Sequence, residues 1–326
     1  TQNENQLPVS ISIIIPVLNN FKLTKHCLEA IQRTDGLTAT EIIVIDNAST
    51  DGTSEFLQKA KLEGRLHFIR NEINQGFARA CNQGAAQARG GLLLFLNNDT
   101  VPLAGWIDAL AGAAKQPSVG IVGAKLIYAN NTIQHAGIGW INGVPDHPHR
   151  HAHPLAPEVN TPRDLDMVTG ACLMIHRDLF LQLAGFDETY RNGVEDIDLC
   201  LRVRAAGRKV VYEPKAVVYH LEGQSVGRFN HVSENLKVFF ERWGKSFDGQ
   251  KNFVVPQPVK IQPARRSLLL EATKADTAKP IKVDWSGSFL DHGSLSHVNR
   301  ELTGALKIFS ELQVNRVANG SQASPG

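Results

Sequence analysis

The sequence lacks the features that mark several common protein classes. No apolar run approaches the roughly 20 residues that cross a bilayer, and the longest, Ile11–Leu18 and Leu92–Leu96, have the length of strands. Residues 1–6 are polar and show no signal-peptide pattern. Lys and Arg number 34 against 32 Asp and Glu, so there is no net basic field to attract nucleic acid. The charge balance therefore predicts that nucleic acid is not a partner.

Cysteine is scarce, and the standard nucleotide-binding loops are missing. The four cysteines, which form no Cys-x-x-Cys pair, are Cys27, Cys81, Cys172 and Cys200. Their apolar surroundings predict buried, reduced thiols, which fits a cytoplasmic protein. The first strand-like run leads into Pro16-Val17-Leu18-Asn19-Asn20 rather than Gly-x-Gly-x-x-Gly, and no Gly-x-x-x-x-Gly-Lys-Ser/Thr occurs. Dinucleotide dehydrogenases and P-loop enzymes are therefore disfavoured.

The first part of the chain alternates strand-like and helix-like segments. Apolar runs predict strands at residues 10–16, 41–46, 66–70, 92–96 and 119–126. Helical spacing predicts helices at residues 23–31, 54–61, 76–89 and 106–115. The fully apolar run 92–96 is typical of a strand that is covered on both faces. This order predicts an α/β fold with a largely parallel sheet and helices on both sides.

The pattern then breaks at residues 142–164, which hold five prolines and the alternating His147, His149, His151 and His153. An extended chain would place these histidines on one face, but no Cys or spaced His pair supports a closed zinc site. We expect a solvated, mobile loop over the functional site. Beyond it the sequence predicts strands at 167–176, 209–212 and 216–220 and helices at 177–184, 196–206 and 232–243. Residues 248–280 resemble a linker, and residues 281–326 predict a further strand and helix.

Polar side chains follow three of the predicted strands, at the ends where ligands bind in an open α/β sheet. Asp46 opens a turn that includes Asp51, Asp99 closes the run Asn97-Asn98-Asp99, and His220 ends the strand 216–220. Each has a structural interpretation, because Asp and Asn suit turns and helix starts and a lone His is more often structural. Each also has a functional one. Mg²⁺ or Mn²⁺ takes one or two carboxylates plus substrate phosphates, which suits Asp99.

Two further groups invite a chemical interpretation. Neutral imidazole binds Mn²⁺, so His220 could contact a metal ion. Arginine binds phosphate groups well, so Arg228 could contact a diphosphate. Glu195-Asp196 precedes a predicted helix, where acidity in the first turn is favourable in itself. A carboxylate at this place could also serve as a general base that takes the proton of an attacking hydroxyl.

Together these segments resemble glycosyltransferase family 2 over about residues 9–247. The matching stretches are Ile13–Asn19, Val44–Thr53, Asn74–Phe77, Phe95–Asp99, Thr169–Cys172, Glu195–Arg202, and His220 with Ser225. The run Asn97-Asn98-Asp99, with Ile133–Gly137, is most similar to bacterial rhamnosyltransferase-type members, which build cell-surface polysaccharides.

The resemblance implies a GT-A fold, an inverting single displacement and a divalent cation, Mg²⁺ or Mn²⁺. It places Asp99 and His220 at the metal, with Asn97 standing where the family's Asp-x-Asp motif has its first acid. It makes Asp196, beside Glu195, the catalytic base. The residues that it implies for nucleotide-sugar binding are Pro16, Asn19, Asp46, Asn47, Asp51, Asn74, Gly76, Arg79, Asn97, Asn98, Gly170 and Arg228.

The expected partners follow from that resemblance. The donor would be a nucleotide-diphosphate sugar, either dTDP-rhamnose-like or a UDP-sugar, and the acceptor a glycan or lipid-linked saccharide, which could bring the protein to the inner face of the membrane. The tail, residues 281–302, resembles the opening strand, loop and helix of a family 4 glycosyltransferase, which predicts further transferase domains in a longer polypeptide. A strand and helix that dock on the main domain are the alternative. A nucleotidyltransferase and a catalytically silent nucleotide-sugar-binding module stay open as other functions.

Overall fold

A mixed sheet forms the centre of the protein, in a computed structural model that describes residues 10–34, 39–221, 230–248 and 252–254. Its strands lie in the order β10-β12-β6-β11-β4-β1-β2-β3, with β5 paired to β12 and β7 to β6, while β8 and β9 form a separate hairpin. The strands are β1 (Ile11–Val17), β2 (Thr40–Asp46), β3 (His67–Arg70), β4 (Leu92–Leu96), β5 (Thr100–Pro102), β6 (Val119–Ile127), β7 (Ile133–His135), β8 (Gly139–Ile141), β9 (Val144–Asp146), β10 (Arg163–Leu165), β11 (Cys172–His176) and β12 (Lys209–His220). The predicted tail, residues 281–326, lies outside the described residues, as does most of the predicted linker.

The long strands of this sheet mostly run in one direction. β1 is parallel to β2 and to β4, β2 is parallel to β3, and β6 is parallel to β12. β11 lies antiparallel between β4 and β6, so these two also point the same way. The predicted α/β fold with a mostly parallel sheet is confirmed.

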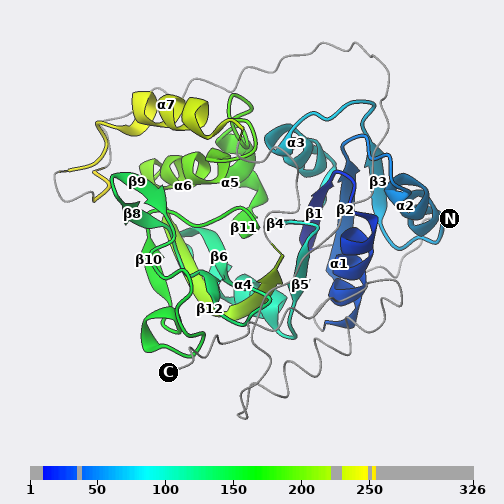
Figure 1. Cartoon of the computed structure of the whole chain (residues 1–326), viewed down its shortest axis with the longest axis horizontal. Helices are drawn as coiled ribbons and strands as arrows, with labels where there is room; N and C mark the ends of the chain where they lie inside the picture. The colour runs from blue at the N-terminus through cyan, green and yellow to red at the C-terminus, as the bar shows by residue number, and fades with distance from the viewer. Residues whose placement is uncertain (1–9, 35–38, 222–229, 249–251, 255–326) are drawn as a thin grey trace, which may run out of the picture. The chain divides into compact units, whose positions relative to one another are not determined.

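Helices cover both faces of the sheet (Figure 1). One face is packed by α3 (Phe77–Gln87), α5 (Arg177–Gln182), α6 (Glu195–Ala205) and α7 (Val232–Trp243). The other is packed by α1 (Phe21–Arg33), α2 (Thr53–Leu62) and α4 (Trp106–Ala114). Alternate residues of a strand point to opposite faces, so Ile14 joins the first core whereas Ile13 and Ile15 join the second. Two apolar cores therefore hold the strand ends in fixed positions.

Two predicted strand boundaries were wrong. The expected strands 209–212 and 216–220 form the single strand β12, which follows β6 across a register shift between Glu213 and Val217. The expected strand 167–176 begins only at Cys172. Residues before it form an isolated bridge to Ile138 at Met167 and then a turn at Gly170, which places that glycine at the edge of the sheet.

The proline- and histidine-rich segment, predicted as a solvated, mobile loop, contains short regular elements. It contains β9, the 3₁₀ helix η2 (Pro157–Val159) and β10. Turn hydrogen bonds from Arg150 N to His147 O and from Ala152 N to His149 O break the extended run, so the four histidines do not share one face. His147 contacts His135 across 2.9 Å between their Nδ1 atoms, and the His151 ring stacks on Tyr128. Individual protein partners thus account for these side chains.

The predicted state of the thiols is confirmed. All four cysteines are buried and free, and burial raises the pKa of the Cys27 thiol to about 12. None of the helices in the described part of the chain is both long and apolar enough to span a bilayer.

Candidate active site

The predicted site residues gather at one edge of the sheet, where the parallel strands end and β11 begins. β2 ends at Asp46, β4 leads into Asn97, and β12 ends at His220. The antiparallel β11 starts at Cys172, opposite Leu96 at the end of β4, so Gly170 and Ala171 lie at the same edge. The topology therefore brings segments from distant parts of the sequence to one place, as expected for an open α/β sheet.

Asp99 and His220 form the centre of this edge. The short strand β5 pairs Thr100 with His220, and the backbone N–H of Leu221 donates to the Asp99 carbonyl over 2.9 Å. These backbone contacts place the Asp99 Oδ1 atom 3.2 Å from His220 Nε2. Both side chains are almost fully buried, with exposed fractions of 10% and 2%. The pair proposed from the sequence is thus held side by side by the sheet itself.

Gln134 determines how the His220 ring is presented. Its Oε1 atom lies 2.7 Å from His220 Nδ1, and because a carbonyl oxygen can only accept, Nδ1 carries the proton. The other ring nitrogen, Nε2, then faces Asp99 and accepts from Asn97 Nδ2 at 3.2 Å. An imidazole held by its far N–H in this way offers the lone pair of the near nitrogen to a cation.

These groups fit a divalent cation. Two ligands at right angles on an octahedral ion with metal–ligand distances of about 2.1 Å lie about 3 Å apart, close to the 3.2 Å between Asp99 Oδ1 and His220 Nε2. A hard carboxylate with an imidazole suits Mn²⁺ better than Ca²⁺. The described part of the chain holds no group of three or more His, Cys, Asp or Glu side chains that could bind a metal ion. Further ligands would therefore come from a bound molecule or water.

Asp196 lies on the same edge, at the start of α6. The backbone N–H of Asn97 donates to the Ala171 carbonyl over 3.0 Å, and the next residue back, Gly170, donates its N–H to Asp196 Oδ2 over 2.6 Å. A Cβ at Gly170 would meet the Asp196 Cβ at 3.0 Å. A side chain at Gly170 would therefore push Asp196 away by a few tenths of an ångström. The hydrogen bond connects Asp196 to the Asn97–Asp99 turn through two residues of backbone.

The two adjacent acids have different surroundings. Asp196 is partly exposed, whereas Glu195 has an exposed fraction of 5%. The Glu195 Oε2 atom accepts the N–H of Gly193 over 2.6 Å, within its own turn. The geometry therefore favours Asp196 as the acid that faces a reactant and Glu195 as a support of the turn.

The residues predicted for the nucleoside lie around the ends of β1 and β2. Asp46 is fully buried, and its Oδ1 accepts the Ser49 N–H over 2.8 Å while its Oδ2 accepts from Arg70 over 2.9 Å and from Ser54. Asp51 is exposed and accepts the N–H of Phe21 over 2.9 Å. Asp46 thus orders the turn that presents Asp51.

Other predicted binding residues lie close to this turn. Pro16 pairs with Ile45 in the sheet, and the Asn19 Oδ1 atom accepts the N–H of Thr50 over 2.7 Å. Asn98 donates to Thr24 Oγ1 on α1 over 2.9 Å. Asn47 donates to the carbonyl of Gly76 over 3.2 Å, which connects this group to the start of α3.

The start of α3 completes the edge. Asn74 Oδ1 accepts the Gly76 N–H over 2.9 Å, and Gly76 has φ 80, a left-handed conformation that favours glycine. Arg79 lies in the first turn of α3 and has no hydrogen bond or ion pair among the residues that the structure describes. Arg228 lies outside the described residues. The structure thus brings the other predicted positions to this edge in three connected groups.

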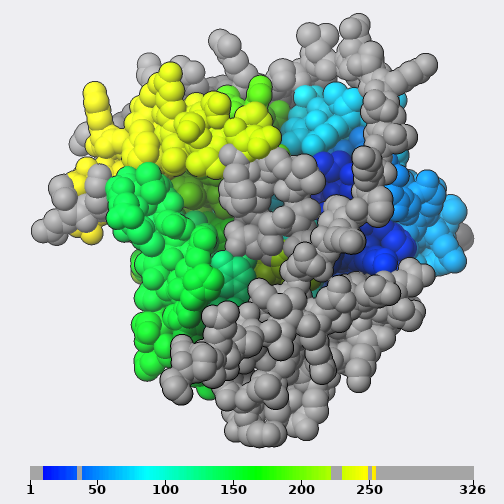
Figure 2. Space-filling model, in the orientation of Figure 1, coloured from blue at the N-terminus to red at the C-terminus, as the bar shows by residue number. Residues whose placement is uncertain are grey.

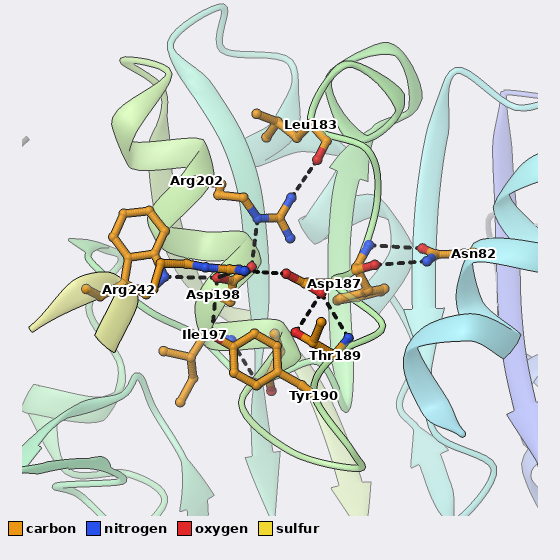
Figure 3. Close-up of polar contacts among 12 residues, drawn as sticks. Asn82, Leu183, Asp187, Thr189, Tyr190, Ile197, Asp198, Arg202 and Arg242 are labelled. Atoms are coloured by element: carbon orange, nitrogen blue, oxygen red, sulfur yellow. Dashed lines mark hydrogen bonds and ion pairs between the residues drawn. The ribbon is translucent and has the colours of Figure 1, made fainter. Parts of the chain in front are cut away.

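Asp198, the third acid of the Glu195–Arg202 segment, has a structural role. Its carboxylate is fully buried on α6 and accepts from Arg202 Nε at 2.7 Å, Arg242 at 2.7 Å and Trp243 Nε1 at 2.9 Å, as Figure 3 shows for the two arginines. Burial, and then the Asp198 charge, raise the pKa of Tyr190 far above its usual range, so this hydroxyl stays protonated. Asp198 therefore joins α6 to α7.

We expect Asp198→Ala to lower the free energy of unfolding by about 3–5 kcal/mol, because it leaves the Arg202 guanidinium buried without its carboxylate. Urea denaturation of the variant measures the loss. Asp164→Ala is the matched control, since Asp164 pairs with Arg204 at the surface with 38% of its side chain exposed, where an ion pair contributes about 0–1 kcal/mol. Equal losses in the two variants would contradict this role for Asp198.

Two residues at the site were not predicted from the sequence. Gln134 lies in the Ile133–Gly137 run that resembles rhamnosyltransferases, but the sequence gives no sign that it contacts His220. Asn235 lies within α7 and hydrogen-bonds the turn before Asp196. An Asn in a helix interior is unfavourable, and this is the one local signal that could have indicated a role for it.

Comparisons with known proteins show which sequences this chain is similar to. Residues 12–183 match the family model described as "Glycosyl transferase family 2". The O-antigen biosynthesis protein RfbC of Myxococcus xanthus is 32% identical over 224 residues, which cover 66% of this chain and 17% of that protein. An N-acetylglucosaminyl-diphospho-decaprenol L-rhamnosyltransferase of Mycobacterium tuberculosis is 29% identical over 215 residues, which cover 57% of this chain and 68% of that protein. For two other curated relatives, the match spans only 25% and 42% of their length.

Solved structures show the same fold. The structure of GalNAc-T7 with UDP, GalNAc and Mn²⁺ superposes with a TM-score of 0.59 at 18% identity, over 74% of this chain and 50% of that one. The mannosyltransferase PcManGT of Pyrobaculum calidifontis, in complex with GDP-Man and Mn²⁺, gives 0.53 at 17% identity, over 72% and 65% of the two chains. At these identities the likeness concerns the fold alone, and it confirms the predicted architecture.

Proposed function

Because the chain belongs to glycosyl transferase family 2, we propose that it is an inverting, divalent-cation-dependent glycosyltransferase with Asp196 as its base. The observation that carries the proposal is the short connection between Asp196 and the Asp99–His220 pair. Asp196 is hydrogen-bonded to Gly170, and the neighbouring Ala171 is hydrogen-bonded to Asn97. The carboxylate proposed as general base and the pair proposed to bind the cation thus lie at one edge of the sheet, which supports transfer to a hydroxyl.

The reaction would be a single displacement at the anomeric carbon of the donor sugar. The acceptor oxygen forms a bond to that carbon as the bond to the diphosphate oxygen breaks, and the nucleoside diphosphate leaves with the electron pair. Asp196 receives the acceptor proton, because its half-buried carboxylate is held in place by the Gly170 N–H. The opposite-side attack inverts the anomeric configuration.

Asp99 and His220 would hold Mg²⁺ or Mn²⁺, with Gln134 fixing the ring of His220. When bound, the cation would offset the negative charge that develops on the leaving diphosphate. Asn97 would contact the nucleotide sugar, Asp51 and the Asp46 turn the nucleoside, and the start of α3 the remainder of the donor. Arg228 would add positive charge near the diphosphate.

The donor and acceptor classes follow from the relatives. We propose a dTDP-rhamnose-like or UDP-linked donor and a glycan or lipid-linked saccharide acceptor used in cell-surface polysaccharide synthesis. Support comes from the rhamnosyltransferase and O-antigen biosynthesis names among the relatives. Such an acceptor would bring the protein to the cytoplasmic face of the membrane. Further transferase domains in the same polypeptide would fit the small share of its longer relatives that this chain spans.

A donor panel tests the proposal. The protein is incubated with dTDP-rhamnose, UDP-sugars and GDP-sugars, with Mn²⁺ or with EDTA, with and without a short-chain N-acetylglucosaminyl-diphospho-prenol. We expect nucleoside diphosphate release with one donor class, only with the cation, and a product of inverted anomeric configuration by NMR. Release of pyrophosphate from a nucleoside triphosphate and a sugar phosphate would indicate a nucleotidyltransferase instead. Donor binding without turnover of any donor would indicate a silent binding module.

A further inference from the structure

The turn that leads into the proposed base has an unusual backbone. Asn192, Gly193 and Val194 have φ values of 51, 150 and 77 in succession. Glycine and asparagine tolerate such angles, but a β-branched residue in the left-handed region is a genuine outlier. Val194 directly precedes Glu195 and Asp196 at the start of α6. Strain of this kind persists only where surrounding contacts impose it, so those contacts identify what holds the turn.

Asn235 of α7 supplies the contacts. Its Oδ1 accepts the N–H of Arg191 over 3.0 Å, and its Nδ2 donates to the carbonyls of Arg191 and Gly193, both over 2.9 Å. The exposed fraction of Asn235 is 4%, so water does not compete for these groups. One planar amide thus binds the turn at both its ends, using its acceptor and both of its donors.

The direction of α6 depends on this turn. The Val194 carbonyl accepts the first helical hydrogen bond, from Asp198 N over 2.9 Å, and the Gly193 N–H donates to Glu195. On its other side the turn reaches α3, because Asn192 Oδ1 accepts the N–H of Phe77 over 3.2 Å. Figure 2 shows α7 (yellow) at the surface beside α3 (light blue). The turn therefore lies between α7 and the predicted donor-binding start of α3.

We infer that Asn235 is a positioning residue, which holds the strained Val194 turn and thereby keeps Asp196 against Gly170. This inference rests on the proposed function, in which Asp196 is the base. Without the amide, Val194 would relax towards negative φ, the start of α6 would rotate, and Asp196 would leave the Gly170 N–H. Displacement of a reacting group by about 1 Å can cost about 100-fold in rate.

Kinetics of Asn235→Ala test the inference, with Glu234→Ala as the matched control because Glu234 is the preceding, exposed residue of α7. We expect kcat to fall about 100-fold while the KM for donor changes less than about threefold. The control should match the unsubstituted chain. A double variant separates positioning from general support. Glycine at position 194 adopts the positive φ without strain, so adding Val194→Gly to Asn235→Ala should raise kcat about tenfold above that of Asn235→Ala alone. Normal kcat in a folded Asn235→Ala variant, or no rescue by Val194→Gly, would overturn the inference.

Hydrogen exchange supplies a readout that does not depend on activity. The Gly170 amide donates to Asp196, so it reports where that carboxylate stands even if no donor is turned over. We expect it to exchange about tenfold faster in Asn235→Ala, with amides of β4 unchanged. Unaltered Gly170 protection in that variant would refute the positioning role. Absence of turnover in the unsubstituted chain, with faster Gly170 exchange in the variant, would refute only the proposed function.

Discussion

Replacing Asp196 with Asn is expected to lower the rate of sugar transfer by about 10²–10⁴-fold, the usual contribution of a positioned general base. Asparagine has nearly the same shape but cannot accept the acceptor proton. Donor binding should stay within about threefold, because the contacts predicted for the nucleoside and for the cation lie at or just after the ends of β2, β4 and β12. The measurements are kcat for transfer and, separately, the Kd for the nucleoside diphosphate by calorimetry.

Glu195→Gln is the matched comparison for this variant. Glu195 is buried and accepts the Gly193 N–H through Oε2, and glutamine retains a carbonyl oxygen for that bond. Its kcat should therefore fall far less than that of Asp196→Asn. Asparagine offers one acceptor to the two N–H groups, of Gly170 and Ile197, that now bond the carboxylate, so thermal unfolding of each variant must accompany the kinetics. Full activity in a folded Asp196→Asn protein would remove Asp196 from its role, and a larger loss in Glu195→Gln would transfer that role to Glu195.

Helical geometry explains why only one of the nearby acids fits the role of base. Successive helical residues turn by about 100°, so Asp198 lies about 200° around α6 from Asp196. One carboxylate faces Gly170 and the edge of the sheet, and the other faces Arg202 and α7. The spacing of two residues in the sequence is enough to predict that Asp196 and Asp198 face different sides of the helix. Identifying the partners of Asp198 required the structure, because Arg242 and Trp243 come from another helix.

The long elements could be predicted because their apolar patterns are strong. β1, β2 and β4 are runs of Ile, Val and Leu that are buried on both faces, and such runs have few alternatives to a central strand. The strands β5, β7, β8, β9 and β10 have three residues each, too few to show alternation. They depend on tertiary pairing, and β5 in particular brings His220 opposite Thr100.

The sequence could indicate candidate site residues that stand at the end of a strand or helix. It could not indicate contacts between residues that are far apart in the sequence. Asp99, Asp196 and His220 stand at strand or helix ends, which local pattern indicates. Their supports come from elsewhere: Gln134 is 86 positions from His220 in the sequence, and Asn235 is 44 positions from Arg191. No local propensity encodes such contacts. In the histidine-rich segment a local pattern misled the prediction. The alternating histidines suggest one shared face, but the turns at His147–Ala152 separate them.

The central claim is that Asp99, with His220, holds the cation on which transfer depends. The most direct measurement is the Mn²⁺ concentration dependence of donor turnover for Asp99→Ala beside Asp108→Ala, which removes an exposed carboxylate from α4. Loss of the carboxylate leaves His220 as the one protein ligand of the pair. The account predicts that Asp99→Ala loses at least about 100-fold in turnover at any Mn²⁺ concentration, while Asp108→Ala behaves as the unsubstituted chain. Unchanged Mn²⁺-dependent turnover in Asp99→Ala would contradict it.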